Sequence, residues 1–557
     1  MLPKKPGTVV GCGLGLFAAA LLLGGLRDPR LAALGEIAAF ALVWLERPAL
    51  GPAAAWLPWL AWAFLSAALS RQPFASSSFL ARWAAVLAFF SLAAAWGEAE
   101  RENWLKTLLA ASAVLAAAAL WTGAGAGFRG SMTGLLPPYY NYTTFAVSAG
   151  VAAGFAWALH PRAARHRPAA LGVAVLGSVC LVLAHGRGAV LGVLCAALVW
   201  TARRWGWKAG LGALLAAGLA GAAFQTDRLP SSWRAYVARH GGPYQDARLE
   251  IWHRAAGIAD ESGPLGAGPG SFGAAFQLRP VEVVGAQARW GLGTDYAHSE
   301  LFQTAAETGW PGLALWLIGL GASLSFLVGR ASEEPAREAA ALAAVAMAAH
   351  LAVDDMLQIP GLALLFFSTL AVAGGGASGG RRWPRAAAVA GALLALVGWI
   401  PRALADGNPA RAAALMPREA YPREDLAYRA MAAGYLAQAD AFWAQAEERA
   451  PFDAVYPWRR AQIAAAQGRW DAAEAFARRA ADAEPGFLND RVLRAEALVR
   501  LGRRADARAE LAGVLQTFNE RGTRARSTSY ELAIWDFDRP EYDRALVLVE
   551  RGPDPRR

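Results

Sequence analysis

The chain has 557 residues, of which 56 % are hydrophobic and 18 % charged, and its formal net charge is +10. The charge is unevenly distributed: 49 of residues 1–400 are charged, or 12 %, against 49 of residues 401–557, or 31 %. The first part has too little charge to cover a globular surface in water, whereas the second has an ordinary soluble composition. A single soluble enzyme is therefore excluded. A nucleic-acid-binding protein is also disfavoured, because it would gather its basic residues on one soluble face.

Thirteen apolar segments within residues 1–400 have about the length that a membrane-spanning helix needs. They are centred near residues 16, 38, 60, 88, 113, 150, 176, 193, 217, 320, 345, 367 and 393. The second, eighth and eleventh are short or interrupted, so the sequence predicts about 12–13 transmembrane helices. The expected fold class is all-α, a polytopic membrane protein followed by a soluble α-solenoid.

Lysine and arginine in the short loops predict the orientation of these helices. With the N-terminus inside, the inside segments contain 16 such residues and the short outside loops contain 5. The basic excess then needs no anionic partner to explain it. This topology places both the long polar insertion 225–297 and everything after the last helix outside. We expect residues 1–400 to form a transmembrane domain that includes the insertion, and residues 401–557 to form a separate domain.

The C-terminal part repeats with a period of 34 residues, which is the spacing of Gly434, Gly468 and Gly502. Alanine and proline recur at the same spacing. Small residues let the two helices of a unit touch, glycine ends the first helix, and proline separates the units. The pattern resembles tetratricopeptide repeats, roughly three of them over residues 415–520. Such arrays bind peptides or partner proteins on a concave face; the alternative is a stabilising cap without a ligand.

Several charged residues fall at the outside ends of the predicted helices, where a charge needs a partner or a cavity. Arg129, Arg187 and Asp354 share this side with the 225–297 insertion, so they can form one site. Within the insertion, a helical pattern begins at Arg248 and places Trp252 one turn away, where both side chains can approach the same ligand. An exposed surface charge is the alternative interpretation of Arg248.

The glycine-rich segment GAGPGSFG covers residues 266–273. A dinucleotide-binding loop would need a preceding buried strand and a following helix in a βαβ unit, and neither is visible. We interpret the segment as a tight turn, with phosphate contact through backbone N–H groups as the lesser alternative. The chain has no GxxxxGK[ST] motif, which argues against an ATP-driven pump.

The segment AHSELFQTAAETGWPG, which begins at Ala297, brings a histidine close to carboxylates. Glu300, Gln303 and Glu307 are three and four residues apart and share one helix face, with His298 at its membrane-surface end. A neutral imidazole can accept a proton from a hydroxyl, and its ordinary pKa of about 6.5 suits a general base near neutral pH. A hydrogen-bonded spacer is the alternative role for such a histidine.

These segments resemble the O-antigen ligase and polymerase superfamily, multi-helix membrane glycosyltransferases that use lipid-diphosphate-linked glycans. The resemblance spans roughly residues 123–370 and rests on five segments in the family's order. They are FRGSMTGLLPPYYN with Arg129 and Asn141, HGRGA with Arg187, RLEIW…GPLGAGPGSF with Arg248, AHSELFQTAAETGWPG with His298 and Glu307, and HLAVDDMLQIP with Asp354. His185 stands where the family commonly has serine before the arginine, but the arginine is retained.

The resemblance implies a GT-C-like membrane fold and a glycan on undecaprenyl diphosphate as the donor. It implies catalytic roles for Arg187 and Arg248, which would hold the diphosphate, and for His298, which would activate the acceptor hydroxyl for direct, inverting attack. The implied substrate-binding residues are Arg129, Asn141, Trp252, Glu307 and Asp354. Because arginine pairs bidentately with phosphate and stays protonated, it can replace a divalent ion. We therefore expect neither a metal nor a cofactor.

Three acceptors stay open: lipid A core in a ligase, a growing polysaccharide in a polymerase, or a protein serine or threonine delivered by the repeat domain. The alternative from another class is a non-catalytic, lipid-binding transporter or scaffold. Arginines gathered at helix ends on one side favour the enzyme.

The expected location is the bacterial inner membrane, with the active site and the C-terminal domain periplasmic. Beyond donor, acceptor and membrane, a protein is a candidate partner through the repeat domain, and no nucleic acid is expected.

Overall fold

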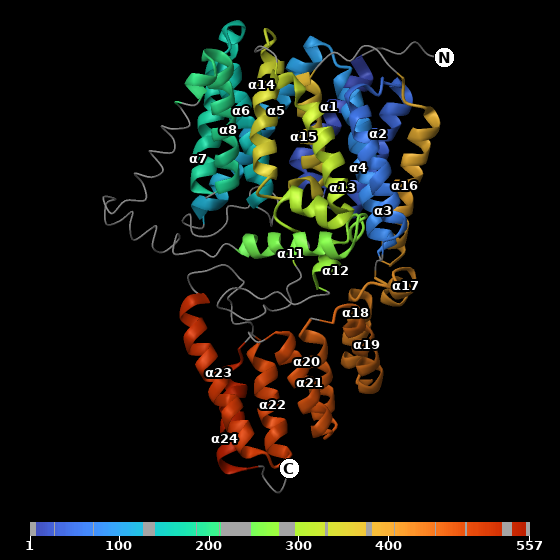
Figure 1. The fold of residues 1–557 in the computed structure, drawn as a ribbon, viewed down its shortest axis with the longest axis vertical. Coiled ribbons are helices and arrows are strands. Elements are labelled where there is room, and N and C mark those ends of the chain that lie inside the picture. Colours follow the sequence, from blue (N-terminus) through green and yellow to red (C-terminus); the bar gives the residue numbers. More distant parts are fainter. Residues whose placement is uncertain are drawn as a thin grey trace, which may run out of the picture. The chain divides into compact units, whose positions relative to one another are not determined.

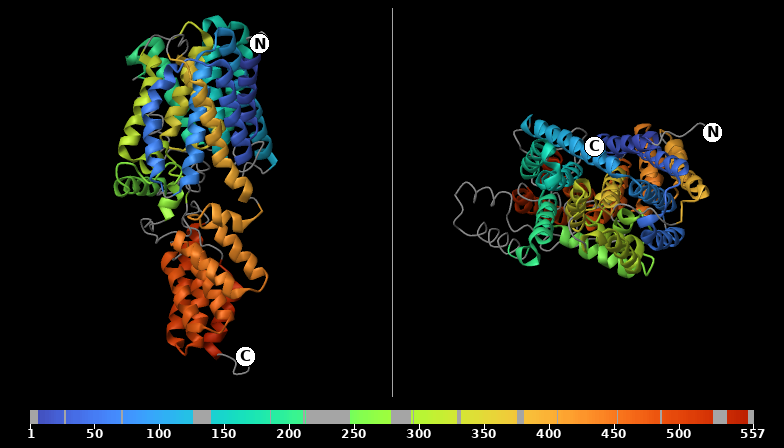
Figure 2. Two further views of the ribbon diagram at one scale, coloured as in Figure 1. Left: turned by 90° about the vertical axis from the view of Figure 1, so that its right-hand side faces the viewer. Right: turned by 90° about the horizontal axis from the view of Figure 1, so that it is seen from above.

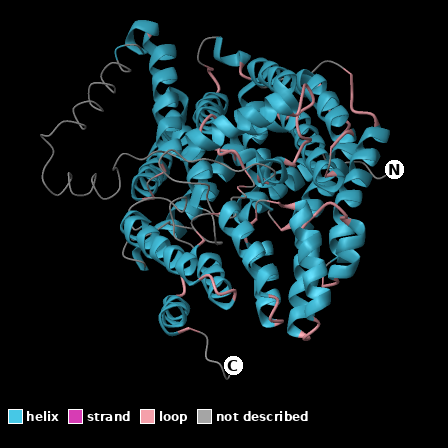
Figure 3. Ribbon diagram, turned by 60° about the horizontal axis from the view of Figure 1, so that its bottom comes forward, coloured by secondary structure: helices cyan, strands magenta, loops and turns pink. Residues whose placement is uncertain are grey.

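The structure of the protein is a computed structural model. It describes residues 7–26, 28–70, 72–125, 140–184, 186–210, 212, 247–277, 294, 296–328, 332–374, 381–405, 407–451, 453–484, 487–525 and 537–552. The regular elements among these residues are all helices (Figure 3). An isolated antiparallel bridge joins Ala49 to Arg382. The all-α prediction is therefore confirmed for the described part of the chain.

The chain forms two compact units. The first comprises Met1–Gln225, Ala259–Gly270 and Ala297–Ile400, and the second comprises Thr226–Ile258, Ser271–Tyr296 and Pro401–Arg557. The insertion predicted over residues 225–297 thus contributes to both units. The domain boundary at residue 400 stays a prediction.

The first unit is a bundle of helices that run roughly along one direction (Figures 1 and 2). Its α-helices are α1 (Gly7–Leu22), α2 (Pro29–Glu46), α3 (Leu57–Ala68), α4 (Pro73–Ala94), α5 (Glu98–Gly125), α6 (Tyr140–Leu159), α7 (Arg167–Leu183), α8 (Arg187–Trp205), α13 (Glu300–Ser323), α14 (Pro335–Leu351), α15 (Pro360–Gly374) and most of α16 (Arg385–Ala405). Its 3₁₀ helices are η1 (Gly24–Leu26), η2 (Gly51–Trp56), η3 (Pro161–His166), η4 (Ser325–Val328) and η5 (Met356–Gln358).

Twelve of the thirteen apolar segments coincide with these helices, and the one near residue 217 lies outside the described residues. Within the part of the chain that the structure describes, four helices are long and apolar enough to cross a membrane: Ala75–Ala94, Glu98–Gly125, Tyr142–Leu159 and Pro161–Leu183. Shorter apolar helices cover Val9–Leu22, Pro360–Gly374 and Arg385–Gly398. These helices fit a membrane protein, whereas the count of 12–13 spans stays a prediction.

An aromatic cluster forms part of the core of this bundle. Trp56, Trp59, Trp83, Trp316 and Phe367 come from η2, α3, α4, α13 and α15 and are all fully or almost fully buried. Their ring centroids lie 4.4 Å apart for Trp59 and Trp83 and 4.9 Å apart for Trp56 and Phe367, both edge to face. Pairs of this geometry add about 0.5–1.5 kcal/mol each beyond area burial. The cluster thereby fixes α13 against α3, α4 and α15.

Helix α14 lies inside the bundle, packed against α6, α8 and α15 (Figure 1). Its alanine-rich sequence allows close approach, because small side chains let helix backbones meet. Helix α14 approaches α8 closely, because a Cβ added to Gly192 would lie 2.2 Å from the carbonyl oxygen of Ala346. One turn earlier in α8, Gly188 meets the side chain of His350 in the same way. The two helices therefore run antiparallel, and the C-terminal end of α14 lies beside the start of α8.

Ion pairs hold the opposite end of α14. Arg101 of α5 forms a bidentate pair with Glu334, with its closest N–O distance at 2.7 Å, and Arg203 of α8 pairs with Glu338 at 3.2 Å. These side chains are largely buried, so removing one partner would leave an uncompensated charge. The contacts anchor the N-terminal end of α14 to α5 and α8.

The second unit contains α11 (Ala247–Glu261), apart from its last residues, α12 (Phe272–Gln277) and the C-terminal helices. The C-terminal helices are α17 (Pro409–Leu415), α18 (Tyr421–Ala432), α19 (Leu436–Arg449), α20 (Val455–Ala466), α21 (Trp470–Ala483), α22 (Leu488–Arg500), α23 (Arg504–Ala525) and α24 (Arg539–Arg551).

From α18 to α23, each helix packs against the next. Gly434, Gly468 and Gly502 follow α18, α20 and α22 with positive φ, so each ends the first helix of a pair as predicted. Classification as tetratricopeptide repeats stays a prediction.

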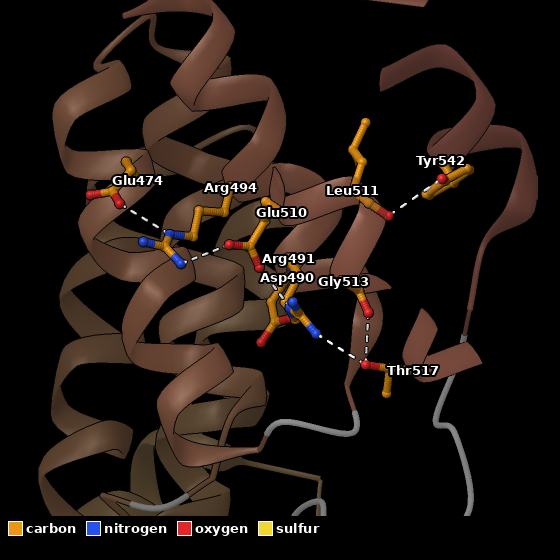
Figure 4. Close-up of polar contacts among 9 residues, drawn as sticks. All are labelled: Glu474, Asp490, Arg491, Arg494, Glu510, Leu511, Gly513, Thr517 and Tyr542. Atoms are coloured by element: carbon orange, nitrogen blue, oxygen red, sulfur yellow. Dashed lines mark hydrogen bonds and ion pairs between the residues drawn. The ribbon is translucent and has the colours of Figure 1, made fainter. Parts of the chain in front are cut away.

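A charged network joins three of these helices (Figure 4). Arg494 of α22 donates to Glu474 of α21 at 3.0 Å and to Glu510 of α23 at 2.9 Å. Arg491, also on α22, donates to Glu510 at 2.6 Å. Since all four side chains are at least three-quarters buried, screening by solvent is reduced and the network specifies the register of α21, α22 and α23.

A groove of about 760 Å³ opens between α20, α22 and α24. Apolar side chains such as Trp458, Leu493 and Leu548 line it together with Glu496 and Arg500. Its mixed lining could receive a partner that offers both apolar and charged groups.

Candidate functional site

His298 lies just before α13, on a backbone that is itself unusual. Its φ of 50° falls in the left-handed region, which residues with a side chain rarely occupy. Two hydrogen bonds hold the turn: the N–H of Ala297 donates to the Gln303 side chain at 2.7 Å, and the N–H of Gln303 donates to the carbonyl of Ser299 at 2.9 Å. Strained conformations of this kind persist where the surroundings fix them, often at functional sites.

Two carboxylates that follow α14 face this imidazole. Nδ1 of His298 lies 3.5 Å from Oδ1 of Asp355 and 3.8 Å from Oδ1 of Asp354. The carboxylates are almost fully buried, with exposed side-chain fractions of 5 % and 3 %, whereas 24 % of the His298 side chain is exposed. The imidazole is thus the group of the three that solvent or a ligand can reach.

Glu300 connects the two segments that carry these residues. Its backbone N–H donates to the carbonyl of Asp354 at 3.1 Å, and its buried carboxylate accepts from the N–H of Leu357 at 3.3 Å and from the Gln358 side chain at 3.4 Å. Arg82 of α4 donates to the Gln358 carbonyl at 2.6 Å. The start of α13, the end of α14 and η5 are therefore held together around the histidine.

The electrostatics of this group follow from burial and charge. Burial alone would lower the pKa of His298, but the neighbouring Asp354 and Asp355 carboxylates outweigh it and raise that pKa to about 9. Burial raises the pKa of Asp355 to about 6, opposed by His298. In the resting protein at neutral pH, the imidazole is consequently mostly protonated and paired with its carboxylates.

Arg187 is the first residue of α8, and its side chain is exposed. The next residue, Gly188, packs against the imidazole of His350 on α14, and Nε2 of His350 lies 3.7 Å from Oδ2 of Asp354. The structure thus brings the segment that carries Arg187 close to the Asp354 and His298 pair. Sequence reasoning joined these residues only through their predicted side of the membrane.

Glu307 lies in the interior of α13 with only 1 % of its surface exposed. Its carboxylate accepts from the Gln303 side chain at 2.7 Å, and Gln303 in turn holds Ala297 beside His298. The predicted polar face of Glu300, Gln303 and Glu307 therefore supports the histidine through protein hydrogen bonds. Direct substrate contact by Glu307 stays a prediction.

The glycine-rich segment packs its backbone against a kink in α13. Gly309 has non-helical backbone angles, and the N–H groups of Ala267 and Gly268 donate to the carbonyls of Ala306 and Glu307, each at 2.9 Å. A Cβ on Gly266, where φ is +67°, would lie 2.5 Å from backbone atoms of Glu307 and Gly309. This arrangement fits the tight-turn interpretation, because two of the N–H groups that could meet a phosphate are bonded to the protein.

The structure does not test whether the remaining predicted residues belong to this group. Arg248 and Trp252 belong to α11 in the second unit, and the predicted helix there is confirmed. Arg129 lies outside the described residues, and Asn141 falls in α6 but its side chain is not among those described. Their predicted roles stay predictions.

The sequence analysis assigned no role to His350, Asp355 or Arg82. The spacing of four residues between His350 and Asp354 was the available signal, because residues at this spacing share a face while a helix continues. In the structure α14 ends at Leu351, before Asp354. Arg82 gave no signal beyond being a charged residue in an apolar segment.

One set of residues could also hold a cation. Ligand atoms of His298, Asp354 and Asp355 all lie within 4.8 Å of one another. One imidazole and two carboxylates form a donor set that suits several divalent metals. A cation bound there would occupy the imidazole lone pair, so a metal site and a general base at His298 exclude each other.

Comparison with known proteins gives one family. A family model described as O-antigen ligase matches residues 172–317. The matched segment begins in α7, ends in α13 and includes Arg187, Arg248, Trp252, His298 and Glu307, whereas Asp354 lies beyond it. The match supports the O-antigen ligase superfamily and, at a coarse level, a ligase-like glycosyltransferase that acts on a lipid-linked glycan in a membrane. No curated protein matches the chain.

Proposed function

We propose that this protein transfers a glycan from undecaprenyl diphosphate to an acceptor hydroxyl, with inversion and without a metal. The observation that carries the proposal is the position of His298: it faces two buried carboxylates, lies near the start of α8 where Arg187 stands, and falls within the segment matched by the O-antigen ligase family. When a hydroxyl displaces a diphosphate, a base takes the proton of the hydroxyl and a positive charge stabilises the leaving diphosphate.

The donor half of the reaction is assigned to arginine. Negative charge develops on the diphosphate as its bond to the sugar breaks, and fixed positive charge in a low-dielectric site stabilises that charge. Arg187 and Arg248 supply it, with Arg129 as a third contact. The N-terminal end of α8 adds a favourable dipole at Arg187. Asn141, Trp252, Glu307 and Asp354 are proposed to line the substrate site.

The acceptor half is assigned to His298. Because Nδ1 faces the carboxylates, Nε2 takes the proton of the acceptor hydroxyl. The hydroxyl oxygen attacks the anomeric carbon from the face opposite the diphosphate, the new C–O bond forms as the bond to the diphosphate oxygen breaks, and the diphosphate leaves with the electron pair. Asp354 and Asp355 stabilise the imidazolium that forms.

Metal independence is tested by chelation. Purified protein is incubated with a lipid-diphosphate-linked glycan and an acceptor, with and without EDTA. Transfer at an unchanged rate in EDTA is the expected result. A strict requirement for Mg²⁺ or Mn²⁺ would contradict metal independence. A cation held by His298, Asp354 and Asp355 would also overturn the general-base role of the histidine.

The acceptor is proposed to be lipid A core or a growing polysaccharide. The groove between α20, α22 and α24 favours a second candidate, protein O-glycosylation, because a partner polypeptide could bind there. The glycans of a deletion strain discriminate among these: unlinked long polymer indicates a ligase, single repeat units indicate a polymerase, and an unglycosylated protein indicates the third activity.

We propose the bacterial inner membrane as the location, with the site and the C-terminal helices in the periplasm. The support is the excess of Lys and Arg in the predicted inside segments, 16 against 5. A non-catalytic transporter or scaffold would use the same arginines to bind lipid headgroups. It would not need His298, so a variant at this residue separates the two classes.

A further inference from the structure

His350 is a buried histidine for which the proposed reaction gives no role. It lies in the last turn of α14 with 2 % of its surface exposed, and its ring centroid is 5.2 Å from that of Phe145. Its Nε2 lies 3.7 Å from Oδ2 of Asp354. An imidazole buried only for packing would not need to face a buried carboxylate.

Asp354 is thereby bracketed by two imidazoles, one at each oxygen. Oδ1 lies 3.8 Å from Nδ1 of His298, and Oδ2 lies 3.7 Å from Nε2 of His350. A carboxylate with a partner at each oxygen has its plane and rotamer fixed, whereas one with a single partner can rotate away. Oδ1 also accepts from the backbone N–H of Asp355 at 3.1 Å, and His350 adds a contact at the other oxygen. These contacts together orient Asp354 toward His298.

His350 also touches the segment that carries Arg187. A Cβ added to Gly188 would lie 2.5 Å from Cδ2 and 2.7 Å from Nε2 of His350, so only glycine leaves room for the ring where it stands. The same imidazole therefore contacts the start of α8 on one side and Asp354 on the other. Together with Val353, whose side chain also approaches Gly188, it links the arginine segment to the histidine and carboxylate pair.

We infer that His350 is a positioning residue: it fixes Asp354 toward His298 and sets the distance between that pair and the start of α8. This inference rests on the proposed function, because it assigns His298 as the base and Arg187 as a donor contact. Partners that orient a functional side chain in this way typically contribute about tenfold to hundredfold in activity without touching the substrate.

The test uses the full chain in detergent or lipid and two substitutions at this position. His350→Phe keeps a planar ring but removes the donor, whereas His350→Gln keeps a donor that can reach Asp354. We expect His350→Phe to lower kcat by about tenfold to hundredfold while KM for the donor stays within about threefold, and His350→Gln to recover most of kcat. Full activity of the Phe variant, or no recovery with Gln, would overturn the inference, since a packing residue is better replaced by Phe.

A substitution in α8 tests the contact between Gly188 and the His350 imidazole from the other helix. Gly188→Ala places a methyl group against the imidazole and is expected to lower kcat as His350→Phe does. Gly172→Ala is the matched control on α7, because a Cβ there meets nothing within 4 Å. Equal activity of the two alanine variants would contradict the inference even if His350→Phe failed to fold.

Failure of this inference and failure of the proposed function give different results. If the unmodified protein transfers no glycan, the proposed function is wrong. If it transfers glycan and His298→Ala does not, while His350→Phe behaves as the unmodified protein, then only the positioning role is wrong.

Discussion

At the scale of single residues, the chemistry depends on how His298 meets Asp354 and Asp355. The carboxylates make the imidazole a stronger base, but they also keep it protonated near neutral pH. Sequence patterns placed His298 and Asp354 on the same side of the membrane. They could not show the contact, because it forms between a turn before α13 and the end of α14, 56 residues apart in the chain.

The pH dependence of transfer follows from this contact. Since the pKa of His298 is raised to about 9, the neutral imidazole becomes more abundant as pH rises toward that value. We expect kcat/KM to increase by up to about tenfold per pH unit from pH 7 and to level off near pH 9. Asp355→Asn removes one of the charges that raise this pKa, so the plateau should begin at a lower pH.

Initial rates of the two proteins over pH 6–10, measured in constant ionic strength, check this prediction. A rate that declines above about pH 9 would show that the protonated imidazole is the active form. That result would contradict the general-base role and would favour an electrostatic one.

Asp490 gives a prediction for the second unit. It is fully buried at the start of α22, one of its carboxylate oxygens has no hydrogen-bond partner within the described part of the chain, and burial raises its pKa well above the ordinary value. Folding therefore favours the protonated acid, so this group's contribution to stability is lost as pH rises from its unfolded pKa toward its folded one. Asp490→Asn should flatten that decline and stabilise the helices around α22 at the upper end of this range.

Hydrogen exchange of the α22 peptides in the full chain between pH 4 and pH 8, corrected for the intrinsic rate, measures this effect. Asp471→Asn is the control, because that aspartate is exposed on α21. Equal pH dependence of the unmodified protein and the Asp490→Asn protein would contradict the account of Asp490.

At the scale of elements, apolar segment length predicts helices well, and the short segments near residues 38, 193 and 345 are the helices α2, α8 and α14. The spacing of Glu300, Gln303 and Glu307 predicted the helix at the start of α13, but it did not predict that this polar face is buried. The segment 300–309 is polar, yet it is helical and buried, because the backbone of the glycine-rich turn and the Ser66 hydroxyl meet the carbonyls near its kink. The helical spacing of the segment does not show which distant residues cover it, so its burial could not be predicted.

The glycine-rich turn can be tested through a matched pair of substitutions. Gly263 and Gly266 both have positive φ, but a Cβ on Gly263 meets nothing within 4 Å, whereas one on Gly266 meets the α13 backbone. Gly263→Ala should cost about 1 kcal/mol from backbone strain alone. Gly266→Ala should cost clearly more, because the backbone of the turn or of α13 must move.

The thermal midpoints of the two purified variants, compared with the unmodified protein, give the measurement. Equal midpoints for Gly263→Ala and Gly266→Ala would show that the turn does not fix the kink of α13.

At the scale of the whole molecule, charge density separated an apolar part from a polar part, and the structure has two compact units. The insertion was the exception. No pattern in the sequence divides it, yet it contributes to both units. Arg248 and Trp252 belong to the second unit, whereas Arg187 and His298 belong to the first.

Topology is testable with reporter fusions. Alkaline phosphatase, which is active only when exported, should be active when fused after Arg557 and inactive when fused after Glu334, in a loop predicted to be inside. The reverse pattern would place the site on the cytoplasmic side and would contradict the proposed access to a periplasmic acceptor.

The central claim is that His298 and Arg187 carry glycan transfer from a lipid diphosphate. The most direct measurement is the initial rate of transfer from a lipid-diphosphate-linked glycan by purified unmodified, His298→Ala and Arg187→Ala proteins, each checked for equal expression and thermal midpoint. The account predicts measurable transfer by the unmodified protein and a loss of at least about a hundredfold in each variant. Transfer at the unmodified rate by both variants would contradict it.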